Sequence, residues 1–88
     1  MPLAGAPVSA LRWRAETIAV WTFYRAELAR HGEALALVVG PTTDGRWQAR
    51  CGSPSRSTRE LAEAGDYLTT EPTAARAKSC AAGWALGV

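Results

Sequence analysis

The sequence predicts an α+β domain in which an antiparallel sheet of about three strands carries one C-terminal helix across one face. In the middle of the chain, a turn signal precedes a clean alternation of apolar and polar residues, which is typical of a half-buried strand. Near the end of the chain, capping residues precede an alanine-rich segment, which is typical of an amphipathic helix. Both patterns fall within 88 residues, the size of a single domain.

The N-terminal third of the chain is the hardest part to interpret. Residues 1–9 contain two prolines and one glycine, which predicts a loose tail and places the globular domain at residues 10–88. Residues 18–24 are β-branched and aromatic, which favours a strand. Residues 25–32 instead have the pattern of a helix end closed by a glycine cap. We favour a strand for the middle of residues 11–31 and leave a helix open as the alternative.

Residues 33–51 predict an antiparallel hairpin. A short apolar run ends at Gly40-Pro41, and Thr-Thr-Asp-Gly follows as a turn signal. The next six residues then alternate in character. We expect one set to face the core and the other to face solvent. The core set is Trp47, Ala49 and Cys51, and the solvent set is Arg46, Gln48 and Arg50.

The remaining elements are less regular until the last one. Residues 52–57 predict a loop, and residues 58–64 predict a short helical turn with Thr58 as its N-cap and Gly65 as its stop. Residues 67–69 suit a brief strand or an extended link. Thr70 is expected to cap the last helix, which should cover residues 72–86.

The last helix is expected to be amphipathic, with small residues on the face that meets the sheet. Trp84 should supply most of the buried area of that face. The expected buried face is Ala74, Ala77, Ala81 and Trp84 with Cys80 beside them, and the expected outer face is Arg76, Ser79 and Gly83.

The chain offers little for catalysis or metal binding. Its only histidine, His31, has no orienting partner nearby in the sequence, and its glycines do not form a phosphate-binding loop. Cys51 and Cys80 lie far apart in the sequence and are expected to be buried free thiols, because a helix packs about 10 Å from a sheet. We therefore expect no enzyme activity, no cofactor and no metal. No signal peptide or membrane span is visible, which favours a cytoplasmic protein without a membrane partner.

Arginines mark the candidate binding surface. The net charge is only +2, but residues 45–59 carry four arginines and no acid, and residues 60–71 carry four acids and no base. An exposed row of Arg and Gln can reach phosphates and base edges, or an acidic protein surface; the alternative is a plain solvated face. The candidate residues are Arg46, Gln48, Arg50, Arg56 and Arg59.

A second candidate patch is Arg12-Trp13-Arg14. Arg and Trp are enriched among the anchors of protein interfaces. The alternative is a core tryptophan flanked by two solvated arginines. If Trp13 and Trp21 are not part of the core, they would form the seam of a homodimer.

Residues 35–85 resemble two families of small sheet-plus-helix DNA-binding domains, those of plant ethylene-response factors and of phage integrases. The resemblance rests on Asp44-Gly45-Arg46-Trp47-Gln48-Ala49-Arg50, followed by a Thr-rich approach to an Ala-rich helix at residues 69–85. It implies that Arg46 and Arg50 contact DNA. The long insertion at residues 52–67 departs from the family pattern.

In size and composition the chain also resembles phage-encoded inhibitors of bacterial defence, including anti-CRISPR proteins. That resemblance implies a protein that binds a host protein or nucleoprotein complex and blocks its action. The sequence thus leaves two hypotheses: an inhibitor of this kind, or a small DNA-binding module that uses an arginine-rich sheet face.

Overall fold

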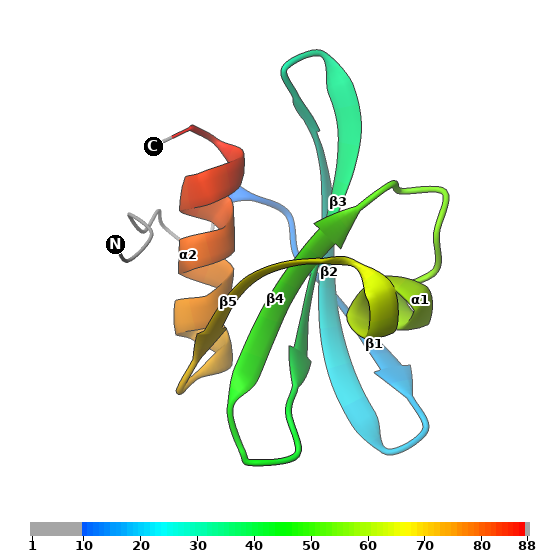
Figure 1. Cartoon of the computed structure of the whole chain (residues 1–88), viewed down its shortest axis with the longest axis vertical. Helices are drawn as coiled ribbons and strands as arrows, with labels where there is room; N and C mark the ends of the chain where they lie inside the picture. The colour runs from blue at the N-terminus through cyan, green and yellow to red at the C-terminus, as the bar shows by residue number, and fades with distance from the viewer. Residues whose placement is uncertain (1–9, 88) are drawn as a thin grey trace.

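The computed structural model describes residues 10–87, and the predicted tail at residues 1–9 lies outside them. The described part contains a five-stranded antiparallel sheet with strand order β1-β2-β3-β4-β5 and two helices (Figure 1). The α+β class is confirmed, but the prediction of about three strands and one helix understates the fold. The elements are β1 (Arg14–Ile18), β2 (Trp21–Arg30), β3 (Glu33–Pro41), β4 (Trp47–Gly52), α1 (Thr58–Ala64), β5 (Asp66–Glu71) and α2 (Ala74–Ala85).

The N-terminal third forms β1 and β2, joined by a two-residue turn between Ile18 and Trp21. The strand interpretation of residues 18–24 is therefore right apart from the turn itself, whereas the helix end expected at residues 25–32 is wrong. His31 and Gly32 both have positive φ, at 53° and 78°, and link β2 to β3. A two-residue hairpin turn and a glycine helix cap both require a positive φ. Gly32 is therefore compatible with either structure, and here it lies in the β2–β3 turn.

The hairpin predicted at residues 33–51 is confirmed as β3 and β4. Leu37 pairs with Cys51 and Val39 pairs with Ala49, so the alternating apolar residues of β4 meet those of β3 on one face. Strand β5 then pairs with β4 across a register shift between Ala49 and Arg50.

Both helices begin near the predicted positions, but with different caps. Ser57, not Thr58, caps α1: its hydroxyl accepts from the N–H of Glu60, and the Glu60 carboxylate accepts from the N–H of Ser57. Thr73, not Thr70, caps α2, because Thr70 pairs with Gln48 in the sheet and the chain leaves β5 only after Glu71. Gly65 ends α1 as expected.

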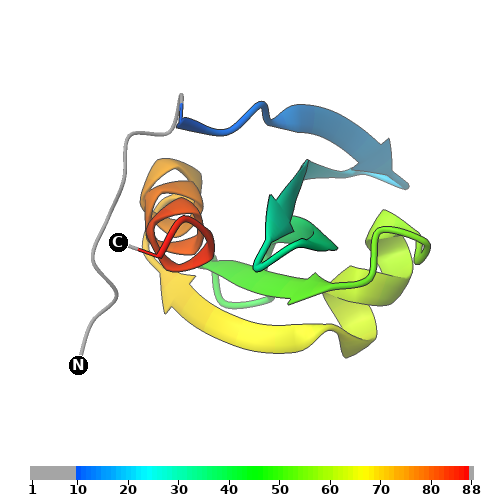
Figure 2. The same ribbon diagram turned by 90° about the horizontal axis from the view of Figure 1, so that it is seen from above.

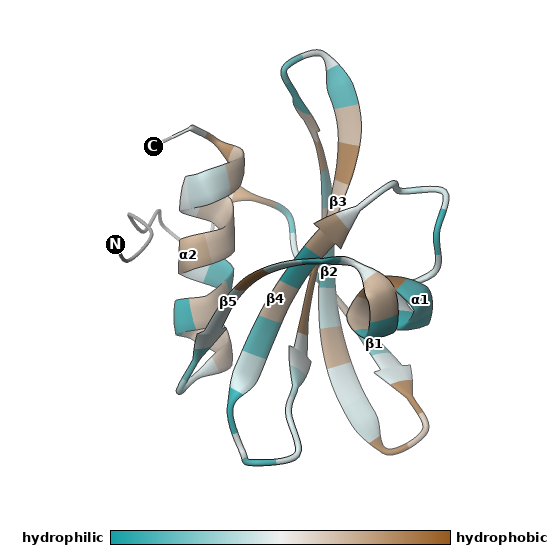
Figure 3. Cartoon of the chain, viewed as in Figure 1, coloured by the Kyte–Doolittle hydropathy of each residue, from teal (hydrophilic) through white to brown (hydrophobic). Residues whose placement is uncertain are grey.

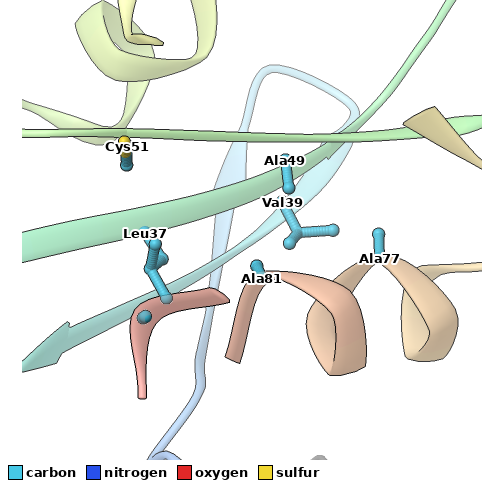
Figure 4. Packing of buried hydrophobic residues seen from close by; sticks show 7 residues of the cluster. Leu37, Val39, Ala49, Cys51, Ala77 and Ala81 are labelled. Carbon is cyan, nitrogen blue, oxygen red and sulfur yellow. The ribbon is translucent and has the colours of Figure 1, made fainter. Parts of the chain in front are cut away.

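One face of the sheet packs against α2. In Figure 4 the side chains of β3 and β4 meet small side chains of the helix, which lets the helix lie close to the strands. Figure 2 shows α2 between the segment that leads into β1 and strand β5. Gly83 is buried there and not on the outer face as expected. The buried cluster consists of Leu37, Val39, Ala49, Cys51, Ala77, Ala81 and Ala85.

Trp84 contributes less to this core than its size suggested. It is half-buried at the rim of the cluster, and the Arg30 guanidinium lies 4.2 Å from the centre of its ring. Several small residues of α2, rather than one tryptophan, therefore make the contact with the sheet.

The opposite face of the sheet packs against α1, which is only seven residues long. Leu61 is the buried anchor of this helix and contacts the cluster of Ala36 and Val38. Phe23 lies directly over Gly40 of the neighbouring strand, where an added Cβ would be 2.4 Å from the phenylalanine ring. The short helix leaves the end of this face beyond Phe23 uncovered. Among the described residues, no helix is long and apolar enough to cross a membrane.

Candidate protein-interaction surface

The three residues expected to form an exposed row on β4 have different environments. Arg46 precedes the strand, is exposed, and its Nε lies 4.0 Å from an Asp44 carboxylate oxygen. Gln48 and Arg50 point away from α2 as predicted, but both are half-buried. Arg50 donates to the Gln48 side chain at 2.9 Å and to the Gly65 carbonyl at 2.7 Å. The expectation of one solvent-facing row is therefore wrong, because Arg50 ties β4 to the end of α1.

The other predicted arginines lie beside carboxylates. Arg56 and Arg59 each have an acid four residues later, Glu60 at 4.0 Å and Glu63 at 3.3 Å. The basic and acidic segments of the sequence are thus interleaved in space. One turn of α1 places Arg59 beside Glu63, and the bend before α1 places Arg56 near Glu60. The hydrogen bonds from Ser57 also hold the pKa of Glu60 below its usual value, so Glu60 keeps its negative charge beside Arg56.

Cations without a carboxylate partner tend to lie over aromatic rings. Arg30 lies over Trp84, Arg50 over Tyr67, and the Lys78 ammonium is 3.5 Å from the centre of the Tyr24 ring. Desolvation lowers the pKa of Lys78. Of these three cations, Arg50 is the one expected to face a ligand, and its charge is engaged within the domain.

The residues of the Arg12-Trp13-Arg14 segment have two different environments. Trp13 is half-buried and packs against the core on the α2 side, whereas Arg12 and Arg14 are exposed. This arrangement matches the interpretation of a core tryptophan flanked by solvated arginines.

Arg25 is an important residue that the sequence did not reveal. Its side chain is buried and donates to the carbonyls of Pro54 at 2.8 Å and Arg56 at 2.9 Å. It also donates to the Thr58 hydroxyl and pairs with Glu27 at 3.0 Å. These bonds hold the loop that leads into α1. The loop partners lie about thirty residues away in sequence, and no local pattern indicates them.

The most exposed large apolar side chains on the sheet lie at the β1–β2 turn. Val20 is 84% exposed and Trp21 is 56% exposed, and they adjoin the uncovered end of the α1 face. Figure 3 shows the hydrophobic colour of this turn at the lower end of the sheet. We call this surface the hairpin patch, and it consists of Ile18, Val20, Trp21, Phe23, Pro41 and Ala62.

Two shallow grooves meet at Trp21 and Phe23. One lies between the β1–β2 turn and α1, and is edged by the Arg59–Glu63 pair. The other lies against Pro41 and Thr42 of the β3–β4 turn. Gln48 and Arg50 line a smaller pocket that also touches Phe23 and Pro41. Three of the predicted binding residues thus border the hairpin patch, namely Gln48, Arg50 and Arg59, whereas Arg12 and Arg46 do not line these three pockets.

The sequence pointed to Trp21 only as a member of a homodimer seam. A run of β-branched and aromatic residues normally predicts a strand buried on at least one face. Nothing in that run shows that the helix covering this face is too short to reach its end.

The potentially reactive groups elsewhere are isolated. Cys51 and Cys80 are free and buried, as expected, and desolvation raises the pKa of both thiols. His31 is exposed in the β2–β3 turn. In the part of the chain that the structure describes, no group of three His, Cys, Asp or Glu residues is placed to hold a metal ion.

Comparison of the chain with protein-family models, with curated proteins and with solved structures finds no match.

Proposed function

We propose that this chain is a non-enzymatic binding protein that contacts another protein through the hairpin patch. The observation that carries the proposal is the exposure of Trp21 and Val20 on an otherwise well-packed domain. Tryptophan is enriched among the residues that dominate interface energies, and contiguous exposed apolar groups on a small soluble domain commonly mark an interaction site. The grooves on both sides of Trp21 give a partner side chain room to dock.

The charge distribution supports a protein partner over a nucleic acid. Nucleic-acid binding draws on cations that are free to neutralise phosphates. Here Arg59 and Arg76 lie beside carboxylates at 3.3 and 2.9 Å, and Arg50 is bonded to a backbone carbonyl. A phosphate would have to displace these contacts.

The specific form that we propose is an inhibitor, carried by a phage or another mobile element, that occupies a host protein or nucleoprotein complex and blocks its action. The small size of the domain and the separation of its few reactive side chains support a role based on occupancy rather than on turnover.

A small DNA-binding module is the alternative, and Arg46 is the residue that favours it. Its side chain is 57% exposed and has only a 4.0 Å contact to Asp44, so it is free to reach a phosphate. Arg12 is also exposed.

The test compares three immobilised proteins: the wild type, the double variant Val20→Ser/Trp21→Ser, and the matched control Arg12→Ala/Arg46→Ala. Each is incubated with an extract of the host cell, and retained proteins are quantified by mass spectrometry. We expect a partner that the wild type and the arginine control retain equally and that the patch variant loses at least about tenfold. Equal retention by all three proteins would overturn the proposal. Thermal melting of each variant checks that it is folded.

The DNA alternative is tested with a fluorescent mixed-sequence duplex at low salt. We expect no change in anisotropy with the wild type. Binding that weakens steeply with added salt and is lost in Arg12→Ala/Arg46→Ala would replace the protein-binding proposal with the alternative.

A further inference from the structure

Strand β1 forms an open edge of the sheet. It pairs only with β2, and four of its five residues are exposed. In Figure 2 its outer side faces away from the other described elements. The other edge strand, β5, is shielded differently: α2 packs beside it, a register shift interrupts its pairing, and Pro72 ends it. The unpaired backbone is therefore concentrated at β1.

The hairpin geometry identifies the backbone groups at this open edge. In a hairpin closed by a two-residue turn, the closing pair is hydrogen bonded in both directions. The closing pair here is Ile18 with Trp21, and hydrogen-bonded pairs recur at every second residue along an antiparallel ladder. Glu16 and Arg14 therefore point their N–H and C=O groups toward β2. Ala15 and Thr17 point theirs outward.

We propose that a second copy of this chain pairs with this edge, antiparallel, with Ala15 of one copy opposite Ala15 of the other. This register forms hydrogen bonds through the outward groups of Ala15 and Thr17. It also places Arg14 directly opposite Glu16 of the second copy, and the two-fold symmetry repeats that pair. Directly opposed side chains on one face of an antiparallel pair lie about 5 Å apart at Cβ, close enough for an ion pair.

Charge selects this register over its neighbours. A shift by one residue places Glu16 opposite Glu16 of the second copy, which brings two carboxylates together. A further shift, centred on Thr17, places Glu16 opposite Ile18 and forms no ion pair. The register centred on Ala15 therefore pairs opposite charges without opposing like ones, whereas a register centred on Arg14 would place Arg14 opposite Arg14 of the second copy.

The side chains concerned are available for this contact. Arg14 is 72% exposed, and its ion pair with Glu27 is a loose one of 3.9 Å. Glu16 is exposed and accepts a hydrogen bond from the Thr58 hydroxyl, which holds the carboxylate in position. Pairing would thus require these two side chains to turn from Glu27 and Thr58 toward the open edge.

The proposed dimer has a consequence for the hairpin patch. The two-fold axis of an antiparallel strand pair is perpendicular to the sheet, so both copies present the α1 face on the same side. Ile18 and its counterpart in the second copy are then offset by about 20 Å along the strands. Two hairpin patches on one face would make the protein bivalent. This consequence rests on the proposed function, whereas the dimer itself does not.

Sedimentation velocity over a range of protein concentrations tests the pairing. We expect a concentration-dependent dimer for the wild type. Thr17→Pro removes an outward N–H without removing a bond to β2, and it should give a monomer with a nearly unchanged melting temperature. Arg14→Glu and Glu16→Arg should each weaken the dimer by about tenfold, and the double swap should restore it. A wild type that stays monomeric at every concentration, or a dimer that none of these changes weakens, would overturn the proposal.

A cysteine scan checks the register independently. Ala15→Cys should form a disulfide-linked dimer on mild oxidation, because opposed residues of a hydrogen-bonded pair have Cα atoms about 5.5 Å apart. Thr17→Cys should stay uncrosslinked, since its counterpart in the second copy would lie four residues further along. Cross-linking of Thr17→Cys but not of Ala15→Cys would contradict the proposed register. The two proposals can fail separately. If the wild type is a monomer but the Val20→Ser/Trp21→Ser variant still fails to retain the partner, the dimer is overturned and the proposed function stands.

Discussion

The two faces of the sheet are covered in different ways, although both carry apolar strand residues. On one face, the twelve residues of α2 bring a series of small side chains against β3 and β4, and the core there is closed. On the other face, the seven residues of α1 rely on Leu61 and on a loop held by Arg25. The shorter helix does not extend over Trp21 and Val20, so the hairpin patch is exposed there. Where the covering helix ends thus determines which part of the sheet can meet a partner.

The largest effect should come from the closed face. Leu37→Ala removes a fully buried side chain from the centre of that core, and we expect it to lower the free energy of unfolding by about 3 kcal/mol. Urea denaturation measures this loss. Leu86→Ala, at a residue 46% exposed, is the control and should change stability by less than about 0.5 kcal/mol. A loss below about 1 kcal/mol for Leu37→Ala would show that this face is not tightly packed.

The next effect should come from the loop that supports α1. Arg25→Met keeps the length of the side chain but leaves the carbonyls of Pro54 and Arg56 without their donor. We expect a loss of about 2 kcal/mol and faster amide hydrogen exchange in residues 53–64. Arg59→Met, in an exposed ion pair, should leave both measurements nearly unchanged. Unchanged exchange in Arg25→Met would mean that Arg25 does not hold α1 in place.

A smaller effect should come from the support beneath the hairpin patch. Gly40→Ala would place a Cβ 2.4 Å from the Phe23 ring and displace that ring from the sheet. We expect a loss of about 1–2 kcal/mol, together with weaker binding of the partner that Trp21 contacts. Calorimetry and the capture experiment measure the two consequences. Wild-type behaviour in both would contradict the close contact between Phe23 and Gly40.

The smallest effect should be a gain in stability at the β1–β2 turn. Ala19 has a φ of 56°, a left-handed conformation that costs an L-residue about 1 kcal/mol. Ala19→Gly should therefore raise the free energy of unfolding by about 0.5–1 kcal/mol. Ala29→Gly, at an exposed position in regular strand, should lower it instead. If Ala19→Gly also destabilised the protein, Ala19 would not have a positive φ in this turn.

The sequence predicted best where local signals were unambiguous. The Asp-Gly turn and the alternation from Trp47 to Cys51 specified the β3–β4 hairpin, because turn and period agreed on one structure. The last helix was found, but both Thr70 and Thr73 can cap a helix and only pairing with β4 decides between them. Residues 25–32 were misassigned, because a final glycine suits both a helix cap and a hairpin turn.

The candidate site was harder to predict because it depends on contacts between distant segments. Arginines that formed a basic segment in the sequence lie beside acids from the following one once α1 forms. The role of Arg25 depends on carbonyls in a separate loop. The exposure of Trp21 depends on the length of α1, which lies far from Trp21 in the sequence, and no pattern near residue 21 indicates that length.

Photo-crosslinking at position 21 tests most directly whether the hairpin patch is the binding surface. A photoreactive phenylalanine analogue replaces Trp21 in one protein and Arg46 in a second, and each is irradiated in the host extract of the capture experiment. We predict a crosslink to one protein from position 21 that position 46 does not give and that excess wild-type protein competes away. Crosslinks from position 46 alone, or to nucleic acid, would contradict the account.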